Sequence, residues 1–182
     1  IADLGLRRER VNCGKLDEIP VAIETVGRLI GRGEKGLAVG TALREQIDAL
    51  RRRALTETNR PTVYVEIWHD PVMTTGKGSF LSELIYLAGG QNIGDEVDKD
   101  YFQASPEWIL KKDPEVILCL YMAERGSARN LVMERSGWKT VKAVVRGSVN
   151  DGFDNNQILR PGPRVLGSIE QLRKAILKTP PP

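Results

Sequence analysis

The chain has 182 residues, of which 41% are hydrophobic and 28% charged, a profile typical of a soluble globular protein that can bury a sizeable core. The net charge of +3 comes from lysines and arginines interleaved with acids, so the composition does not indicate a nucleic-acid partner. No apolar run approaches the ~20 residues of a membrane span, and the opening Ile1 to Leu4 is typical of the interior of a protein sequence rather than of a signal peptide.

The first part of the chain predicts one short strand and two helices. The strand is expected over Glu9 to Cys13, and the first helix runs from an N-cap at Asp17 to a stop at Gly31. The second helix is expected from Glu34 to Glu57, which at 1.5 Å per residue is roughly 35 Å long. The apolar stripe of the first helix consists of Ile19, Ile23, Val26 and Ile30.

From Asn59 onward, predicted strands alternate with predicted helices. The strands are expected at 62–68, 116–120 and 148–150, and the helices at 79–88, 105–112, 128–134, 140–145 and 164–178. Val116 to Leu120 is almost entirely apolar, as expected of a strand that is covered on both faces. The pattern predicts an α/β fold, a three-layer lobe with a largely parallel sheet, preceded by the long connecting helix.

The cysteine and histidine content argues against a metal centre. Cys13 and Cys119 each end a predicted strand and are expected to be small buried core residues. They lack the CxxC spacing of zinc and redox sites, and the chain contains a single histidine.

In an open α/β sheet, ligands bind at the loops that follow the carboxyl ends of the strands. Three such loops are predicted, over residues 68–79, 121–124 and 151–164. The first contains Gly76-Lys77-Gly78-Ser79, which invites comparison with a phosphate-binding GxxxxGK[ST] loop. The motif fails, because Pro71 stands where its first glycine belongs and Lys77 is followed by Gly78.

The remaining candidate residues each allow a structural and a functional interpretation. His69 beside Asp70 could serve as a general base or a metal ligand, line a binding surface, or simply end a strand. Arg160 and Arg164 flank a helix start and could bind carboxylate or phosphate groups, although Pro163 is an ordinary residue for such a position. Glu107 lies in a helix first turn, where the helix dipole favours a carboxylate.

Several blocks of sequence, in this order, resemble the helical-backbone solute-binding proteins of ABC importers, whose ligands are cobalamin, ferric siderophores, haem and bare metal ions. The blocks are KLDEIP at 15–20, TVGRLIG at 25–31, EIWHDPVMT at 66–74, ELI at 83–85, LAGGQNI at 87–93, SPE at 105–107, KDPEVIL at 112–118, GW at 137–138 and LRPGPR at 159–164. The resemblance covers nearly the whole chain, and the set is most similar to members that bind cobalamin or iron complexes.

The resemblance implies a domain organisation. Residues 1–32 are expected to be a remnant of an amino-terminal lobe, 33–58 the spine helix that links two lobes, and 59–182 the carboxyl-terminal α/β lobe. The ligand cleft of the family lies between lobes, so this chain is expected to contribute half of it. We expect the apolar stripe of the first helix, uncovered in this arrangement, to cause self-association through Ile1 to Gly31.

The resemblance also implies a function without catalysis, cofactor or resident metal. The protein would be a periplasmic or cell-surface component that closes on a metal chelate and delivers it to the permease subunits of an ABC importer. The expected ligand-binding residues are Trp68, His69, Tyr121, Phe153 and Arg160. Glu107 matches the acidic position with which the family docks onto permease arginines.

Two other functions stay open at this point. One is a ligand-sensing or interaction domain that keeps the fold without a role in transport. The other is an enzyme of the same layered fold, which would need a nucleophile and a buried carboxylate beside His69, and no such set is visible in the sequence.

Overall fold

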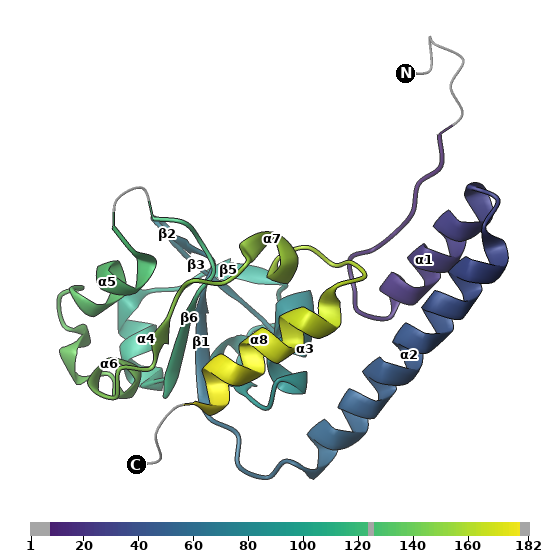
Figure 1. Cartoon of the computed structure of the whole chain (residues 1–182). Coiled ribbons are helices and arrows are strands. Elements are labelled where there is room, and N and C mark those ends of the chain that lie inside the picture. The colour runs from purple at the N-terminus through teal and green to yellow at the C-terminus, as the bar shows by residue number, and fades with distance from the viewer. Residues whose placement is uncertain (1–7, 124–125, 179–182) are drawn as a thin grey trace.

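The computed structural model describes residues 8–123 and 126–178 (Figure 1). Two antiparallel helices, α1 (Glu18–Leu29) and α2 (Gly33–Thr56), lie at one side of an α/β unit that contains all later elements. The long helix is therefore confirmed, one residue away from its predicted bounds at each end.

The α/β unit contains the remaining elements. Its strands are β1 (Thr62–Glu66), β2 (Trp68–His69), β3 (Val72–Thr75), β4 (Gln91–Asn92), β5 (Tyr101–Gln103), β6 (Val116–Cys119) and β7 (Val149–Asn150). Its α-helices are α3 (Phe80–Leu87), α4 (Pro106–Lys112), α5 (Ala128–Met133), α6 (Lys142–Val145), α7 (Asn155–Ile158) and α8 (Val165–Leu177), and its 3-10 helices are η2 (Ile93–Glu96) and η3 (Trp138–Thr140).

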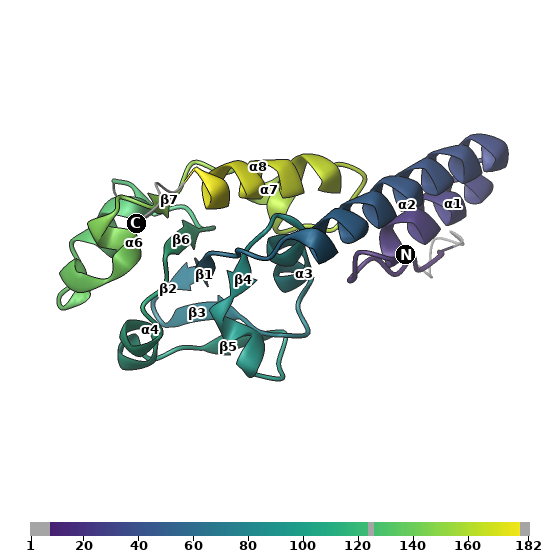
Figure 2. The same cartoon turned by 90° about the horizontal axis from the view of Figure 1, so that it is seen from below.

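The main sheet has the strand order β4-β1-β6-β7, and all three of its ladders are parallel. Side chains alternate between its faces, so Val63 and Val65 of β1 point into one core while Tyr64 points into the other. The first core contains residues of α3 and α8, and the second contains residues of α4, α5 and α6. Figure 2 shows α3 and α8 on one side of β1 and β6, and α4 and α6 on the other. The three-layer α/β fold with a largely parallel sheet is confirmed.

A second, antiparallel sheet of β2, β3 and β5 was not predicted: β3 lies in the predicted loop 68–79, and no element was predicted at 101–103. Its strands are two to four residues long, too short to give a recognisable alternation of apolar and polar residues. The Thr74 hydroxyl donates to the Val65 carbonyl oxygen at 2.7 Å and ties this sheet to β1.

The predicted strand at Glu9 to Cys13 is wrong, because residues 8–13 form no regular structure and pair with no strand of the described chain. Cys13 is accordingly half-buried rather than a core residue, and its Sγ lies 3.6 Å from the Pro161 carbonyl oxygen. Cys119, on the central strand β6, is buried as predicted.

Helices α1 and α2 approach each other closely at two glycines. A Cβ on Gly27 would lie 2.7 Å from the Cα of Gly36, so a larger residue would separate the helices. The apolar stripe of α1 is only partly uncovered, because Ile19 is fully buried whereas Val26 and Ile30 are 44% and 66% exposed. The exposed half lines an apolar groove of ≈ 670 Å³ that also reaches residues 161–163.

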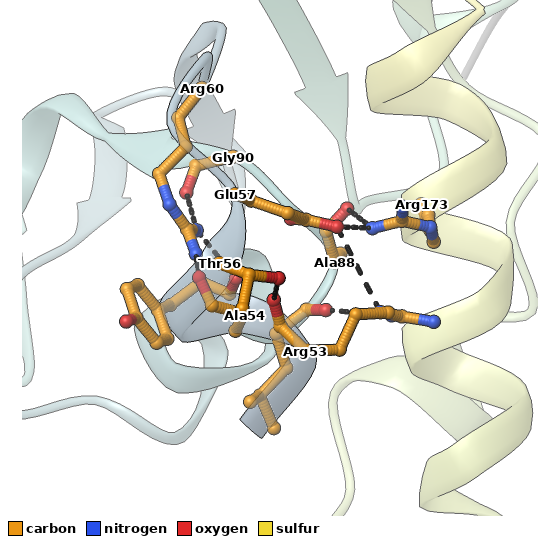
Figure 3. Close-up of polar contacts among 10 residues, drawn as sticks. Arg53, Ala54, Thr56, Glu57, Arg60, Ala88, Gly90 and Arg173 are labelled. Carbon is orange, nitrogen blue, oxygen red and sulfur yellow. Dashed lines mark hydrogen bonds and ion pairs between the residues drawn. The ribbon is translucent and has the colours of Figure 1, made fainter. Parts of the chain in front are cut away.

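The carboxyl end of α2 is fastened to the α/β unit by charged side chains (Figure 3). The Arg60 guanidinium donates to the carbonyl oxygens of Ala54, Tyr86 and Gly90, and thereby caps the ends of α2 and α3 together. The Glu57 carboxylate accepts from Arg173 of α8 at 2.5 Å. The direction of the long helix is therefore fixed relative to the sheet at this end.

Candidate functional site

Three of the predicted ligand-binding residues meet at the carboxyl edge of the main sheet. Trp68 and His69 form β2, directly after β1, and Tyr121 follows β6 (Figure 1). The His69 and Tyr121 rings are stacked, with centroids 5.2 Å apart and planes at 17°. The Trp68 ring lies 5.4 Å from His69 and 6.4 Å from Tyr121, which makes the three rings one aromatic cluster.

The members of this cluster differ in exposure. Trp68 is 45% exposed, His69 is partly buried, and Tyr121 is only 6% exposed. The buried ring of Tyr121 therefore packs against the inner side of His69, while the ring of Trp68 is exposed to solvent. Met122, the residue after Tyr121, is 85% exposed. Because the Trp68 Nε1 donates to the Asp70 carbonyl oxygen at 2.7 Å, the indole is held in place.

Below the aromatic cluster lies a buried carboxylate, Glu66, which ends β1 and has no exposed surface. It accepts two hydrogen bonds from the Arg135 guanidinium, at 2.8 and 2.9 Å, so the ion pair is bidentate. The hydroxyl of Tyr121 donates to it at 2.8 Å and that of Tyr64 at 3.1 Å. These four donors satisfy the acceptor sites of the carboxylate.

The geometry of the sheet explains why these groups meet. Tyr64 and Glu66 are two residues apart on β1 and point to the same face, and Glu66 is in register with Cys119 of the neighbouring β6. Tyr121, two residues after Cys119, continues that face. Burial raises the pKa of both the Tyr64 and the Tyr121 hydroxyl above the usual value, and the negative charge of Glu66 raises each further. Both tyrosines are therefore neutral donors at ordinary pH.

Sequence reasoning missed Glu66 and Arg135. A charged residue inside the apolar stretch 62–68 was a usable signal, because a buried carboxylate requires a partner. Its partner could not be identified, since Arg135 is 69 residues away and lies beyond α5. Arg135 also stands over the ring of Trp138, 4.4 Å from its centroid, where it makes a cation–π contact.

The two other predicted ligand-binding residues lie in separate hollows. Phe153 is partly buried and lines a hollow of ≈ 380 Å³ that includes Arg129 and Lys174. Arg160 is exposed and lines another, of ≈ 230 Å³, together with residues 161–164. The structure thus brings together three of the five predicted residues. Both residues that lie outside the cluster come from the third predicted loop, over residues 151–164.

Glu107 lies where the sequence predicted, in the first turn of α4. Ser105 caps this helix by accepting from the Trp108 backbone N–H at 3.2 Å, and Pro106 occupies its first position. The Glu107 side chain is exposed, and no ion pair of its carboxylate occurs within the described residues. Its charge is therefore available at the surface.

Residues 8–123 and 126–178 contain neither a metal-binding cluster nor a membrane-spanning helix. In these residues no group of three or more His, Cys, Asp or Glu side chains is arranged to hold a metal ion. None of the helices there combines the length and the apolar character needed to cross a bilayer.

Comparison of the sequence with known proteins gives consistent matches. The family model described as periplasmic binding protein matches residues 7–152. The substrate-binding lipoprotein YvrC of Bacillus subtilis, described as an uncharacterized ABC transporter protein, is 26% identical over 180 residues, covering 97% of this chain and 55% of that protein. A vitamin B12-binding protein of Vibrio cholerae is 27% identical over 161 residues, covering 86% of this chain and 55% of the relative. This chain thus spans about half the length of these relatives.

Solved structures share the fold. A possible iron-binding solute-binding protein of Staphylococcus epidermidis matches with a TM-score of 0.80 and 22% identity, covering 96% of this chain and 68% of the other. The periplasmic vitamin B12 binding protein BtuF of Vibrio cholerae matches with a TM-score of 0.73 and 23% identity, covering 98% and 68%.

Proposed function

Because this chain belongs to the periplasmic binding protein family, we propose that it is part of the extracytoplasmic solute-binding component of an ABC importer for a metal chelate. The observation that carries the proposal is the aromatic cluster of Trp68, His69 and Tyr121 at the carboxyl edge of a parallel sheet, where ligands of such sheets bind. A flat macrocycle such as a corrin or a porphyrin presents a face that rings of this kind can contact. Relatives named as vitamin B12-binding proteins support this ligand class.

The proposed protein binds and releases its ligand without converting it. The buried carboxylate behind this cluster, Glu66, is engaged by four hydrogen-bond donors, so it is not available as a general base or nucleophile. An enzyme of the same fold is therefore not favoured. A sensor or interaction domain would use the same ligand face, and the docking experiment below separates it from a transport protein.

The binding proposal predicts that chelates contact Trp68. We expect cyanocobalamin, haemin or a ferric hydroxamate to bind the chain, and replacement Trp68→Ala to weaken binding of the preferred chelate at least tenfold, because exposed tryptophans dominate such contacts. Equilibrium dialysis at chelate concentrations up to millimolar measures both affinities. A matched control is Tyr86→Leu, which removes an aromatic ring of similar exposure (40%) from α3. Equal affinities for the Trp68 and Tyr86 variants would contradict the proposal.

We further propose that Glu107 docks the protein onto arginines of its permease. The charge reversal Glu107→Lys is expected to weaken association with the permease without changing chelate affinity. The loss should be larger at low ionic strength, where a rim charge contributes most to association. Uptake by reconstituted vesicles, measured with a chelate titration of the same variant, checks both parts.

The control for docking is Glu45→Lys, which makes the same charge change at an exposed position of α2. If Glu107 serves only the helix dipole, Glu107→Ala costs ~0.3–1 kcal/mol of stability and leaves uptake unchanged. Uptake by the Glu107→Lys protein equal to that of the Glu45→Lys protein would show that Glu107 is an ordinary residue of a helix start.

A further inference from the structure

We propose that Glu66 is a positioning residue for the ligand face: its carboxylate, held by Arg135, fixes the ring of Tyr121 and, through that ring, the imidazole of His69. The inference rests on the proposed function in one respect, that the Trp68–His69 surface contacts the ligand. It adds a buried polar support that does not itself touch the ligand.

The orientation of His69 depends on packing. Its Nδ1 atom is buried, and no hydrogen-bond partner for it occurs in the described residues. The imidazole is therefore oriented by the two rings beside it, Trp68 at 5.4 Å and Tyr121 at 5.2 Å. Of these, the nearly parallel ring of Tyr121 sets the plane in which His69 lies.

The Tyr121 ring is fixed at its far end, where the hydroxyl lies. Its hydroxyl donates to Glu66 Oε1 at 2.8 Å, and the same oxygen accepts from Arg135 Nη2 at 2.9 Å. The other carboxylate oxygen accepts from Arg135 Nη1 and from the Tyr64 hydroxyl. With both oxygens engaged, the carboxylate cannot rotate without breaking charge-assisted bonds, so the hydroxyl of Tyr121 has one defined acceptor position.

Stability alone does not account for the buried ion pair of Glu66 and Arg135. Apolar residues of similar volume often stabilise a core as well as a buried ion pair does, or better. What the ion pair supplies in addition is a fixed acceptor at one point of the core. That acceptor holds the hydroxyl of Tyr121, the ring on which His69 stacks.

The test uses the fact that the chain contains a single histidine, so its ring protons give NMR signals that need no assignment. The ring current of Tyr121 should displace these signals from their random-coil positions. Two uncharged double variants are compared with the wild type. Glu66→Leu with Arg135→Met removes the acceptor, whereas Glu66→Gln with Arg135→Met keeps an amide oxygen that can accept from Tyr121.

We expect the leucine variant to lose at least half of the displacement of the His69 signals and the glutamine variant to keep it. Titration with cyanocobalamin in the same samples should show about a tenfold weaker affinity for the leucine variant only. If the leucine variant does not fold, Tyr121→Phe removes the hydroxyl alone and should give the same losses. Signals and affinities within twofold of the wild type in the Leu or Phe variant would overturn the inference.

The outcomes also separate this inference from the proposed function. If cyanocobalamin, haemin and a ferric hydroxamate all fail to bind the wild type while the His69 displacement still depends on residue 66, the proposed function is overturned and the positioning of His69 by Glu66 is supported. If a chelate binds and the displacement does not depend on residue 66, the positioning role is overturned and the function stands.

Discussion

Replacement of Arg135 by methionine is expected to lower the free energy of unfolding by ~3–5 kcal/mol, because it leaves the fully buried Glu66 without its ionic partner. Methionine retains much of the apolar stem of arginine, so little of this loss should come from packing. Denaturant unfolding followed by circular dichroism measures the change, provided that the transition stays two-state.

The matched control for this prediction is Arg146→Met. Arg146 lies 3.3 Å from Glu115, and this pair is partly exposed on both sides, so its loss should cost only ~0–1 kcal/mol. Glu66→Gln with Arg135→Met should recover most of the stability that Arg135→Met loses, since no buried charge remains and the amide can bond to both tyrosine hydroxyls. A loss for Arg135→Met no larger than that for Arg146→Met would contradict the prediction.

Much of the fold was predictable because its main elements are long or strongly patterned. The apolar run at 116–120 required a strand covered on both faces, and β6 has one core on each side. The last helix and α2 follow the periodic spacing of their apolar residues. Residues 9–13 were also predicted as a strand but form none, because a strand needs a neighbour to pair with, and local sequence does not supply that information.

The candidate site was predictable only in part, for a related reason. Trp68, His69 and Tyr121 could be placed together because the carboxyl ends of parallel strands meet at one edge of a sheet. The same rule placed Phe153 and Arg160 at that edge, but the loop after β7 carries them into separate hollows. Contacts between segments far apart in sequence, such as that of Glu66 with Arg135, become visible only once the chain is folded.

A polypeptide of these 182 residues is expected to bind cobalamin, haemin and ferric siderophores with dissociation constants weaker than micromolar. High-affinity pockets bury 70–90% of the surface of a ligand. The aromatic cluster is one-sided, with Trp68 as its exposed member, so a flat chelate that lies on it keeps its other face in water. Each ~1.4 kcal/mol of lost contact energy weakens the affinity tenfold.

The share of its relatives' length that this chain covers also leads us to expect a weak affinity. The chain spans about half the length of the relatives that it matches, which leaves room in those proteins for a second wall opposite this face. Isothermal titration calorimetry on the polypeptide checks the expectation. Haemin has a second possible site in the apolar groove of α1 and α2. The variant Val26→Glu tests for binding there, because it places a negative charge in the groove and leaves the aromatic cluster unchanged. A submicromolar affinity that Trp68→Ala removes and Val26→Glu does not would mean that this face alone is a complete binding site.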